Sequence, residues 1–305
     1  DWSSDVCSSD LASEVMTKII QDLQEARILL NEDPVKTEGG LSSGNAGESS
    51  NFLCYRALRL NYYAVTGLLA RVCLYAGQRE NAFNYSTEVI KASNNGIFPF
   101  VDRSLVNGTA QDPDRIFSPE VLFALSDSQR GELFEEYFDP SLAPNMVFRM
   151  ETDLLEQTIY GGTGTGGNLD DYRCRSNWIS SGSARYFYKY SDMTESGRIE
   201  NTMIPLLRLG EMYLIAAESQ SNSLANGVSY INTLRKNRGV SNLQTLTTTL
   251  LQYEYIREVY GEGQLFFMYK RMYSSIIRSN SATNNPAPSN AVFVVPLPDT
   301  ETENR

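Results

Sequence analysis

The chain has 305 residues, of which 41% are hydrophobic, and a formal net charge of −11. It is long enough to bury one large core or two modest ones. The negative charge, without any Lys/Arg block, argues against binding nucleic acid or an anionic membrane surface by simple electrostatics. The absence of histidine excludes Ser-His-Asp and Cys-His triads and histidine-based zinc sites within this chain.

The first eleven residues, DWSSDVCSSDL, differ in character from the rest. They are rich in Ser and Asp, and they have neither the basic nor the apolar region of a secretory signal. We expect residues 1–11 to be an adapter-like, non-native segment and the native protein to continue upstream. The domain then spans residues 12–305. The four cysteines show no metal-type spacing, and no metal or cofactor is expected.

Three helices are predicted in the first third of the chain. Residues 12–31 place an apolar residue every three or four positions. Residues 52–76 form a second apolar helix that Gly77 should end, and residues 79–93 follow at once. Two helices joined by so short a turn should pack antiparallel as a hairpin.

The segment 204–220, IPLLRLGEMYLIAAESQ, reads as a helix that is apolar on most sides and therefore buried. Buried charges need partners, so we expect Arg208 to meet Glu211 one turn on and Glu218 to meet a basic residue on a neighbouring helix. A second hairpin helix over residues 224–240 and a long helix over residues 249–272 should follow.

These elements predict a mainly α fold. Tetratricopeptide-like helical hairpins over 12–95 and 203–273 should form a scaffold. Between them, residues 96–202 should be a long, irregular, loop-rich insertion, with short strands at VLFALSD and ARYFYKY. We expect this insertion to form the ligand face.

Three sequence patterns suggest specific chemical functions. GGTGTGG at 161–167 matches the spacing of a dinucleotide-binding loop, but no strand precedes it and no helix follows, which favours a flexible surface loop. Glu254, Glu258 and Glu262 share one helical row and could include the two carboxylates of a glycoside hydrolase. Pairing with Arg257, Lys270, Arg271 or Arg208 is the structural alternative. Asp170 and Asp171 could hold calcium, but adjacent acids in a loop are common.

Aromatic residues are frequent in the irregular region. Flat rings on loops suit the apolar faces of sugars, although such loops also use rings to anchor themselves on a scaffold. Trp178, in the polar context RSNWISSGS, is the best candidate for ligand contact. The other candidate ligand-binding residues are Tyr160, Tyr172, Tyr186 and Tyr188.

Four blocks in order carry a family resemblance: IPLLRLGEMYLIAAES, INTLRKNRG, EYIREVYGEGQLFFMYKR and VVPLPDTETENR. Together with the helix pair NYYAVTGLLARVCLYAGQRENAFNYSTEVIKA, they resemble the SusD/RagB family of outer-membrane nutrient-binding lipoproteins over residues 12–305. Leu265 and Met268 depart from the family pattern, which often has Arg and Asp there. The anchoring cysteine of the family is also missing, and Cys7 lacks the context to replace it.

The resemblance implies a tetratricopeptide-like scaffold and a lipid-anchored position on the extracellular face of the outer membrane. It also implies a SusC-like TonB-dependent transporter as partner and an oligosaccharide, or less readily a peptide, as ligand, bound without cleavage. Two alternatives stay open: a carboxylate-based glycoside hydrolase and a tetratricopeptide-like protein-interaction module. On the family reading, five residues form structural ion pairs: Arg208, Glu211, Glu218, Glu258 and Arg271.

Overall fold

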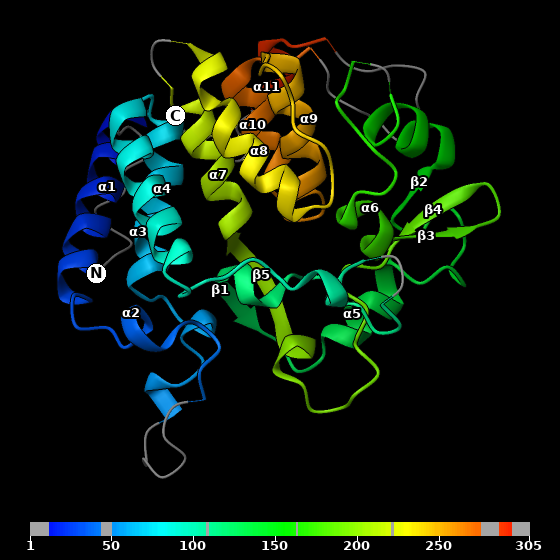
Figure 1. Cartoon of the computed structure of the whole chain (residues 1–305), viewed down its shortest axis with the longest axis horizontal. Helices are drawn as coiled ribbons and strands as arrows, with labels where there is room; N and C mark the ends of the chain where they lie inside the picture. Colours follow the sequence, from blue (N-terminus) through cyan, green and yellow to red (C-terminus); the bar gives the residue numbers. More distant parts are fainter. Residues whose placement is uncertain are drawn as a thin grey trace, which may run out of the picture.

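A computed structural model describes residues 12–43, 51–107, 110–162, 164–220, 223–275 and 287–294. The fold is mainly α-helical, as the sequence predicts (Figure 1). The longer helices fill the left and upper parts of this view, and the short strands and most loops lie at the right and below. The segment 1–11, with Cys7, and residues 295–305 of the last resemblance block lie outside the described residues.

The first hairpin is formed by α3 (Tyr62–Tyr75) and α4 (Arg79–Asn94). The turn between them contains Gly77 at φ +77°, a conformation that residues with a Cβ rarely adopt. The predicted helix 52–76 is too long at its start, because Asn61 caps α3 by accepting a hydrogen bond from the Ala64 amide. The residues before it form two 3-10 turns instead.

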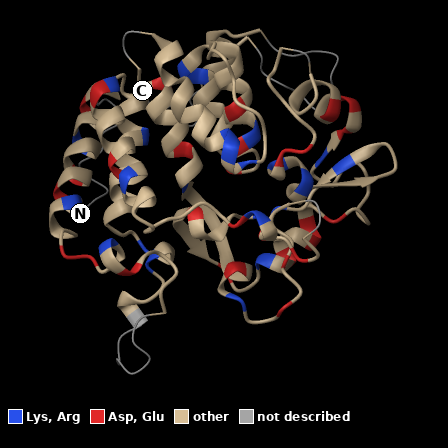
Figure 2. Ribbon diagram, in the orientation of Figure 1, with Lys and Arg blue, Asp and Glu red and all other residues tan. Residues whose placement is uncertain are grey.

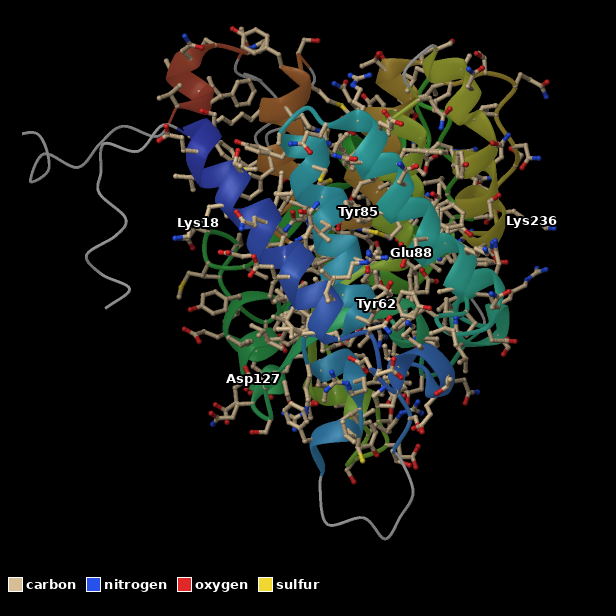
Figure 3. The ribbon with its side chains drawn as sticks, turned by 90° about the vertical axis from the view of Figure 1, so that its left-hand side faces the viewer. Lys18, Tyr62, Tyr85, Glu88, Asp127 and Lys236 are labelled. Carbon is tan, nitrogen blue, oxygen red and sulfur yellow. The ribbon has the colours of Figure 1, made fainter. Side chains whose placement is uncertain are left out.

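Helices α1 (Ala12–Leu29), α3 and α4 pack together on the face shown in Figure 3. Arg27 of α1 donates to both carboxylate oxygens of Glu88 at 2.8 and 2.7 Å. The Tyr62 hydroxyl donates to the same carboxylate at 2.8 Å, and the Arg27 guanidinium lies 5.0 Å from the Tyr62 ring and 5.7 Å from the Tyr85 ring. These contacts tie three helices together at a partly exposed position.

The second hairpin contains α7 (Leu209–Glu218) and α8 (Val228–Asn237). Every residue of α7 is buried. The predicted helix start at 204 is wrong, because residues 203–208 form strand β5, which pairs antiparallel with β1 (Val121–Ser126). A short apolar run is compatible with either structure, and periodicity alone cannot separate a strand from a buried helix.

The predicted helix 249–272 is two helices, α9 (Thr248–Val259) and α10 (Leu265–Met272). Gly261 and Gly263 interrupt it at φ +74° and +73°. A Cβ on Gly261 would lie 2.5 Å from the Phe187 ring, so this close approach between chain segments requires glycine.

The irregular region contains short elements held by two small sheets. Strand β1, predicted from VLFALSD, is confirmed, whereas ARYFYKY is a strand only over its first half. The second sheet has the antiparallel order β2-β4-β3. Its elements and their neighbours are α5 (Arg130–Tyr137), β2 (Arg149–Glu151), the π-helix Leu154–Ile159, α6 (Tyr172–Asn177), β3 (Trp178–Ser181), β4 (Ala184–Phe187) and the 3-10 helix Ile199–Thr202.

One large core joins the two hairpins to the irregular region. It runs from α3 and α4 through α7 to α9 and includes Met268, one of the two family departures, which is buried. The short helices α2 (Val35–Glu38) and α11 (Asn290–Phe293) complete the described helical part. Within the described residues, no helix has the length and apolar character that crossing a lipid bilayer requires.

Candidate ligand-binding face and buried ion-pair network

Aromatic rings gather where α5 meets the second sheet. The Phe134 ring lies 5.0 Å from Tyr188, edge to face, and 6.4 Å from Phe138, nearly parallel to it. The Phe138 ring in turn lies 5.5 Å from Phe148. Tyr137, at the end of α5, accepts the Phe148 amide with its backbone carbonyl. We call Phe134, Tyr137, Phe138, Phe148 and Tyr188 the aromatic face.

The aromatic face is partly open to solvent. Tyr137 is 48% exposed and Phe148 is 43% exposed, while Phe134, Phe138 and Tyr188 are half-buried. The Arg115 guanidinium lies 5.9 Å from the centre of the Tyr188 ring. Burial, followed by the charge of Asp139, raises the pKa of Tyr188, so its hydroxyl stays a hydrogen-bond donor at neutral pH. Such a surface offers ring faces and polar groups together.

Three of the predicted ligand residues are buried. Trp178, at 6% exposure, packs on Phe187 and Tyr260 with ring centres 4.9 and 5.0 Å apart. Tyr160 is 2% exposed, and Tyr186 is buried in a small cluster beside Val147 and Ala184. At this burial their rings have no free face for a sugar, so in this structure they anchor the irregular region.

The remaining two predicted residues differ from each other. Tyr172 is half-buried and packs against the small cluster of Val101, Val106 and Phe117. Its ring lies so close to Gly239 that a Cβ there would be 2.4 Å away. Tyr188 is the one predicted ligand residue that belongs to the aromatic face. Phe134 and Phe148 are not among the predicted ligand residues, although the i, i+4 spacing of Phe134 and Phe138 is a detectable signal on a short helix.

A buried ion-pair network joins the scaffold to the irregular region, and Glu258 lies at its centre. Its carboxylate accepts from Arg208 at 3.0 Å, from Arg238 at 2.7 and 3.1 Å, and from Arg173 at 3.1 Å. Arg238 also pairs with Glu120, which directly precedes β1. Figure 2 shows acidic and basic residues close together where α8 and α9 meet the loop region.

Glu254 and Glu262, which the sequence places in one row with Glu258, are also paired with basic residues. Glu254 accepts from Arg173 at 3.0 Å, from Arg257 at 3.0 Å and from Arg235. Glu262 accepts from Arg208 at 2.7 Å and from Lys189. The side chains of Glu254 and Glu258 are fully buried. Of the suggested basic partners, Arg208 and Arg257 serve this row.

The predicted pairing of Arg208 with Glu211 is wrong. Arg208 ends strand β5 and is therefore not one helical turn before Glu211, which instead binds Arg71 of α3 at 2.7 and 2.6 Å. Glu218 does meet a basic residue on another helix: Arg271 of α10 donates to both of its oxygens at 2.8 Å. Each of the five residues named as ion-pair members thus has a partner of opposite charge.

The hydrolase reading requires a carboxyl group that carries a proton near neutral pH. Burial by itself raises the pKa of Glu254, but the charges of Arg173, Arg257 and Arg235 outweigh it and lower the pKa to about 2. Burial is likewise outweighed at Glu258, where Arg238, Arg208 and Arg173 hold the pKa well below its usual range. Both groups stay ionised and have no solvent access, so neither can serve as a general acid.

These pKa shifts predict a loss of stability in acid. A carboxylate with a lowered folded-state pKa contributes stability that is present above its unfolded pKa, near 4.5, and is lost as pH falls toward about 2. We expect the free energy of unfolding, from urea titrations followed by circular dichroism, to fall steadily over this window. In the Glu254→Gln variant part of this slope should disappear, and an unchanged slope would contradict the assignment.

The described residues of the GGTGTGG loop are held in place at several points, against the expectation of a flexible surface loop. It follows the π-helix Leu154–Ile159 rather than a strand. Arg257 donates to the backbone oxygens of Ile159 and Thr165 at 2.7 and 2.8 Å, and Thr165 is buried. Asp171, considered for calcium, accepts from Arg173 with both oxygens at 2.9 and 2.6 Å and caps α6.

Comparisons with known proteins agree with this architecture. The SusD family model matches residues 128–292, more than half of the chain. The fold resembles a putative sugar binding protein from Bacteroides vulgatus (TM-score 0.65, 21% identity, 95% of this chain and 63% of that one). It also resembles a SusD-like carbohydrate binding protein from Bacteroides vulgatus (TM-score 0.56, 20% identity, 87% and 53%) and a laminarin binding SusD-like protein (TM-score 0.54, 18% identity, 85% and 61%).

The chain thus spans between half and two thirds of the length of these structures. None of the curated proteins compared with it gives a significant match. At such low identity the structural likeness shows the fold alone, and the family assignment rests on the match over residues 128–292. The chain belongs to the SusD family.

Proposed function

We propose that the chain is part of a non-catalytic cell-surface protein that binds a nutrient, an oligosaccharide, and delivers it to a SusC-like TonB-dependent transporter. The aromatic face carries this proposal. Family membership supports it, as do the carbohydrate-binding and laminarin-binding descriptions of structural relatives.

The chemistry of the aromatic face suits a sugar. A pyranose ring presents CH groups on its faces and hydroxyls around its edge, so an exposed ring stacks on the faces while polar neighbours bond the hydroxyls. Phe148 and Tyr137 supply exposed ring surface, and the Tyr188 hydroxyl and the carboxylate of Asp139 supply polar groups. Several rings arranged over neighbouring elements suit an oligosaccharide better than a single sugar.

We propose different roles for the helical part and the irregular part of the chain. Residues 12–95 and 203–273 act as scaffold, and residues 96–202 carry the ligand face. We propose that a lipid anchor holds the whole protein at the extracellular side of the outer membrane. The hydrolase alternative is disfavoured by the paired, ionised state of Glu254 and Glu258.

Ligand binding tests the proposal. We expect the purified chain to be retarded in native gels containing a soluble polysaccharide, with the sugar recovered at its original size. Phe148→Ala and Tyr188→Ala should each weaken binding roughly five- to tenfold, because one stacked ring contributes about 1 kcal/mol.

The structure offers a matched control for each variant. Phe267 on α10 is 47% exposed, close to the value for Phe148, and lies outside the aromatic face. Tyr85 on α4 is half-buried beneath an arginine, as Tyr188 is, but on the scaffold face of Figure 3. Equal effects of Phe267→Ala and Phe148→Ala would refute the site, and shortened sugar would establish hydrolysis instead.

A further inference from the structure

Arg130, the first residue of α5, is the centre of a buried group of hydrogen bonds beside the aromatic face. Its Nη1 atom donates to the backbone oxygens of Glu200 at 2.6 Å and of Met203 at 3.2 Å. Its Nη2 atom donates to the backbone oxygen of Ser191 at 3.3 Å and to Oδ1 of Asp192 at 2.9 Å. An arginine carries five N–H donors, so these bonds use every donor except the Nε–H group.

Two buried polar atoms lie at the same small cavity without a partner. Nε of Arg130 and Oδ1 of Asp114 form no hydrogen bond with any described residue. The other Asp114 oxygen, Oδ2, accepts from the backbone amide and the hydroxyl of Ser118, each at 2.8 Å. Both Arg130 and Asp114 line a cavity of about 10 Å³. A buried donor and a buried acceptor are costly unless something bonds to both.

One water molecule fits this cavity in size and in chemistry. A buried water needs roughly 10–15 Å³ and at least two polar partners. It can accept from the Nε–H group and donate to Oδ1 at the same time. Three positive side chains of the lining oppose a cation, and two carboxylates oppose an anion. The charged lining residues are Asp114, Arg115, Arg130, Lys189 and Glu200.

Tyr188 of the aromatic face is tied to this group of hydrogen bonds. Ser191, whose backbone oxygen is bound by Arg130, donates from its amide and its hydroxyl to the Tyr188 backbone oxygen at 3.0 and 2.9 Å. On the helix that Arg130 begins, the Phe134 ring packs edge to face on Tyr188 with ring centres 5.0 Å apart. The loop on the far side of the cavity carries Arg115, whose guanidinium lies 5.9 Å from the Tyr188 ring centre. Arg130 therefore holds the segment with Tyr188 against the helix with Phe134.

We propose that Arg130 positions Tyr188 in the aromatic face, and that a buried water molecule joins Arg130 to Asp114. The water completes the five hydrogen bonds of the guanidinium, so that α5, the loop of Asp114 and the segment of Tyr188 are fixed to one another. Arg130 is a positioning residue, because its side chain is 2% exposed and does not reach a ligand. The effect on sugar binding rests on the proposed function, whereas the water site does not.

Titrations with laminarin, the polysaccharide named for one structural relative, test the positioning role. Arg130→Met and Tyr188→Ala should each weaken binding roughly five- to tenfold, at a temperature where both variants are folded. Because Arg130 acts through Tyr188, the double variant should bind no more than about twofold more weakly than Tyr188→Ala alone. Two losses that multiply to roughly 25- to 100-fold would overturn the proposal.

Arg56→Met is the matched control, because Arg56 is also a buried arginine that binds an aspartate and backbone carbonyls. It donates to Asp33 at 3.0 and 2.7 Å, and to the backbone oxygens of Phe52 and Leu60 at 3.2 and 3.4 Å. It lies in a 3-10 turn before α3, outside the aromatic face. Arg56→Met should lose stability as Arg130→Met does but keep its laminarin affinity within about twofold. Equal losses of affinity would reduce Arg130 to a general contribution to stability and overturn the proposal.

Hydrogen exchange followed by mass spectrometry separates this proposal from the proposed function. If the unmodified chain bound no polysaccharide, the proposed function would fail, and exchange would still test the positioning. The amides of residues 188–193 should exchange roughly tenfold faster in Arg130→Met than in Arg56→Met. Equal exchange of this segment in the two variants would overturn the positioning role.

A high-resolution crystal structure of the chain tests the water site. We expect one ordered water within about 3.2 Å of both Nε of Arg130 and Oδ1 of Asp114. The Asp114→Leu variant, which removes the acceptor, should lack this water. Direct contact between the two atoms, or an ion in place of the water, would overturn the water-mediated link.

Discussion

Replacing Glu258 with alanine is expected to remove about 3–5 kcal/mol of folding free energy, a large share of the roughly 5–15 kcal/mol by which a domain is usually stable. The side chain is fully buried and accepts hydrogen bonds from Arg208, Arg238 and Arg173. Without it, three guanidinium groups share a low-dielectric site with one fewer counter-charge. Arg238 keeps Glu120 and Arg173 keeps Asp171, which limits the loss but does not cancel it.

The matched control for this prediction is Glu88→Ala. Glu88 also accepts two hydrogen bonds from an arginine, Arg27, but its side chain is 34% exposed. Solvent screening reduces such a pair to about 1 kcal/mol or less. Urea denaturation followed by circular dichroism measures both changes. If Glu258→Ala costs no more than Glu88→Ala, the network has no special role in stability.

The helical hairpins could be predicted from the sequence because their periodicity is local. Residues three or four apart share a face, and Gly77 marks the turn. The strand over 203–208 and the break at Gly261 could not be predicted, because each depends on a distant segment. Strand β5 exists because β1 pairs with it, and Gly261 is needed because Phe187 packs against it.

The partners of charges and rings were harder to predict for the same reason. A buried carboxylate on a helix predicts that a basic partner exists but not which one: Glu211 binds Arg71, which is 140 positions away. Among the loop aromatics, composition predicts that some rings are exposed without identifying them. Trp178 is buried although its sequence context is polar, whereas Phe148 is 43% exposed although the apolar residues Met146 and Val147 precede it.

Gly210→Ala is expected to destabilise the protein by about 3 kcal/mol or more, although alanine is the better helix former by about 1 kcal/mol. A Cβ at this position would lie 2.1 Å from the Glu258 Oε1 atom and 2.6 Å from its carboxyl carbon. Arg208 and Arg238 hold that carboxylate in place, so it cannot move without breaking their hydrogen bonds. The added methyl group would therefore disrupt the ion-pair network around Glu258.

Gly131→Ala provides the control, because Gly131 is the second residue of α5 just as Gly210 is the second residue of α7. A Cβ there would also meet a carboxylate oxygen, but only at 2.9 Å. That oxygen is Oδ2 of Asp192, whose side chain is 47% exposed and holds Arg130 through Oδ1, so a shift of a few tenths of an ångström relieves the contact without breaking that bond. We expect Gly131→Ala to change the free energy of unfolding by no more than about 1 kcal/mol. Similar costs for the two variants would mean that the Glu258 carboxylate yields as readily as an exposed one, and that the network is not rigid.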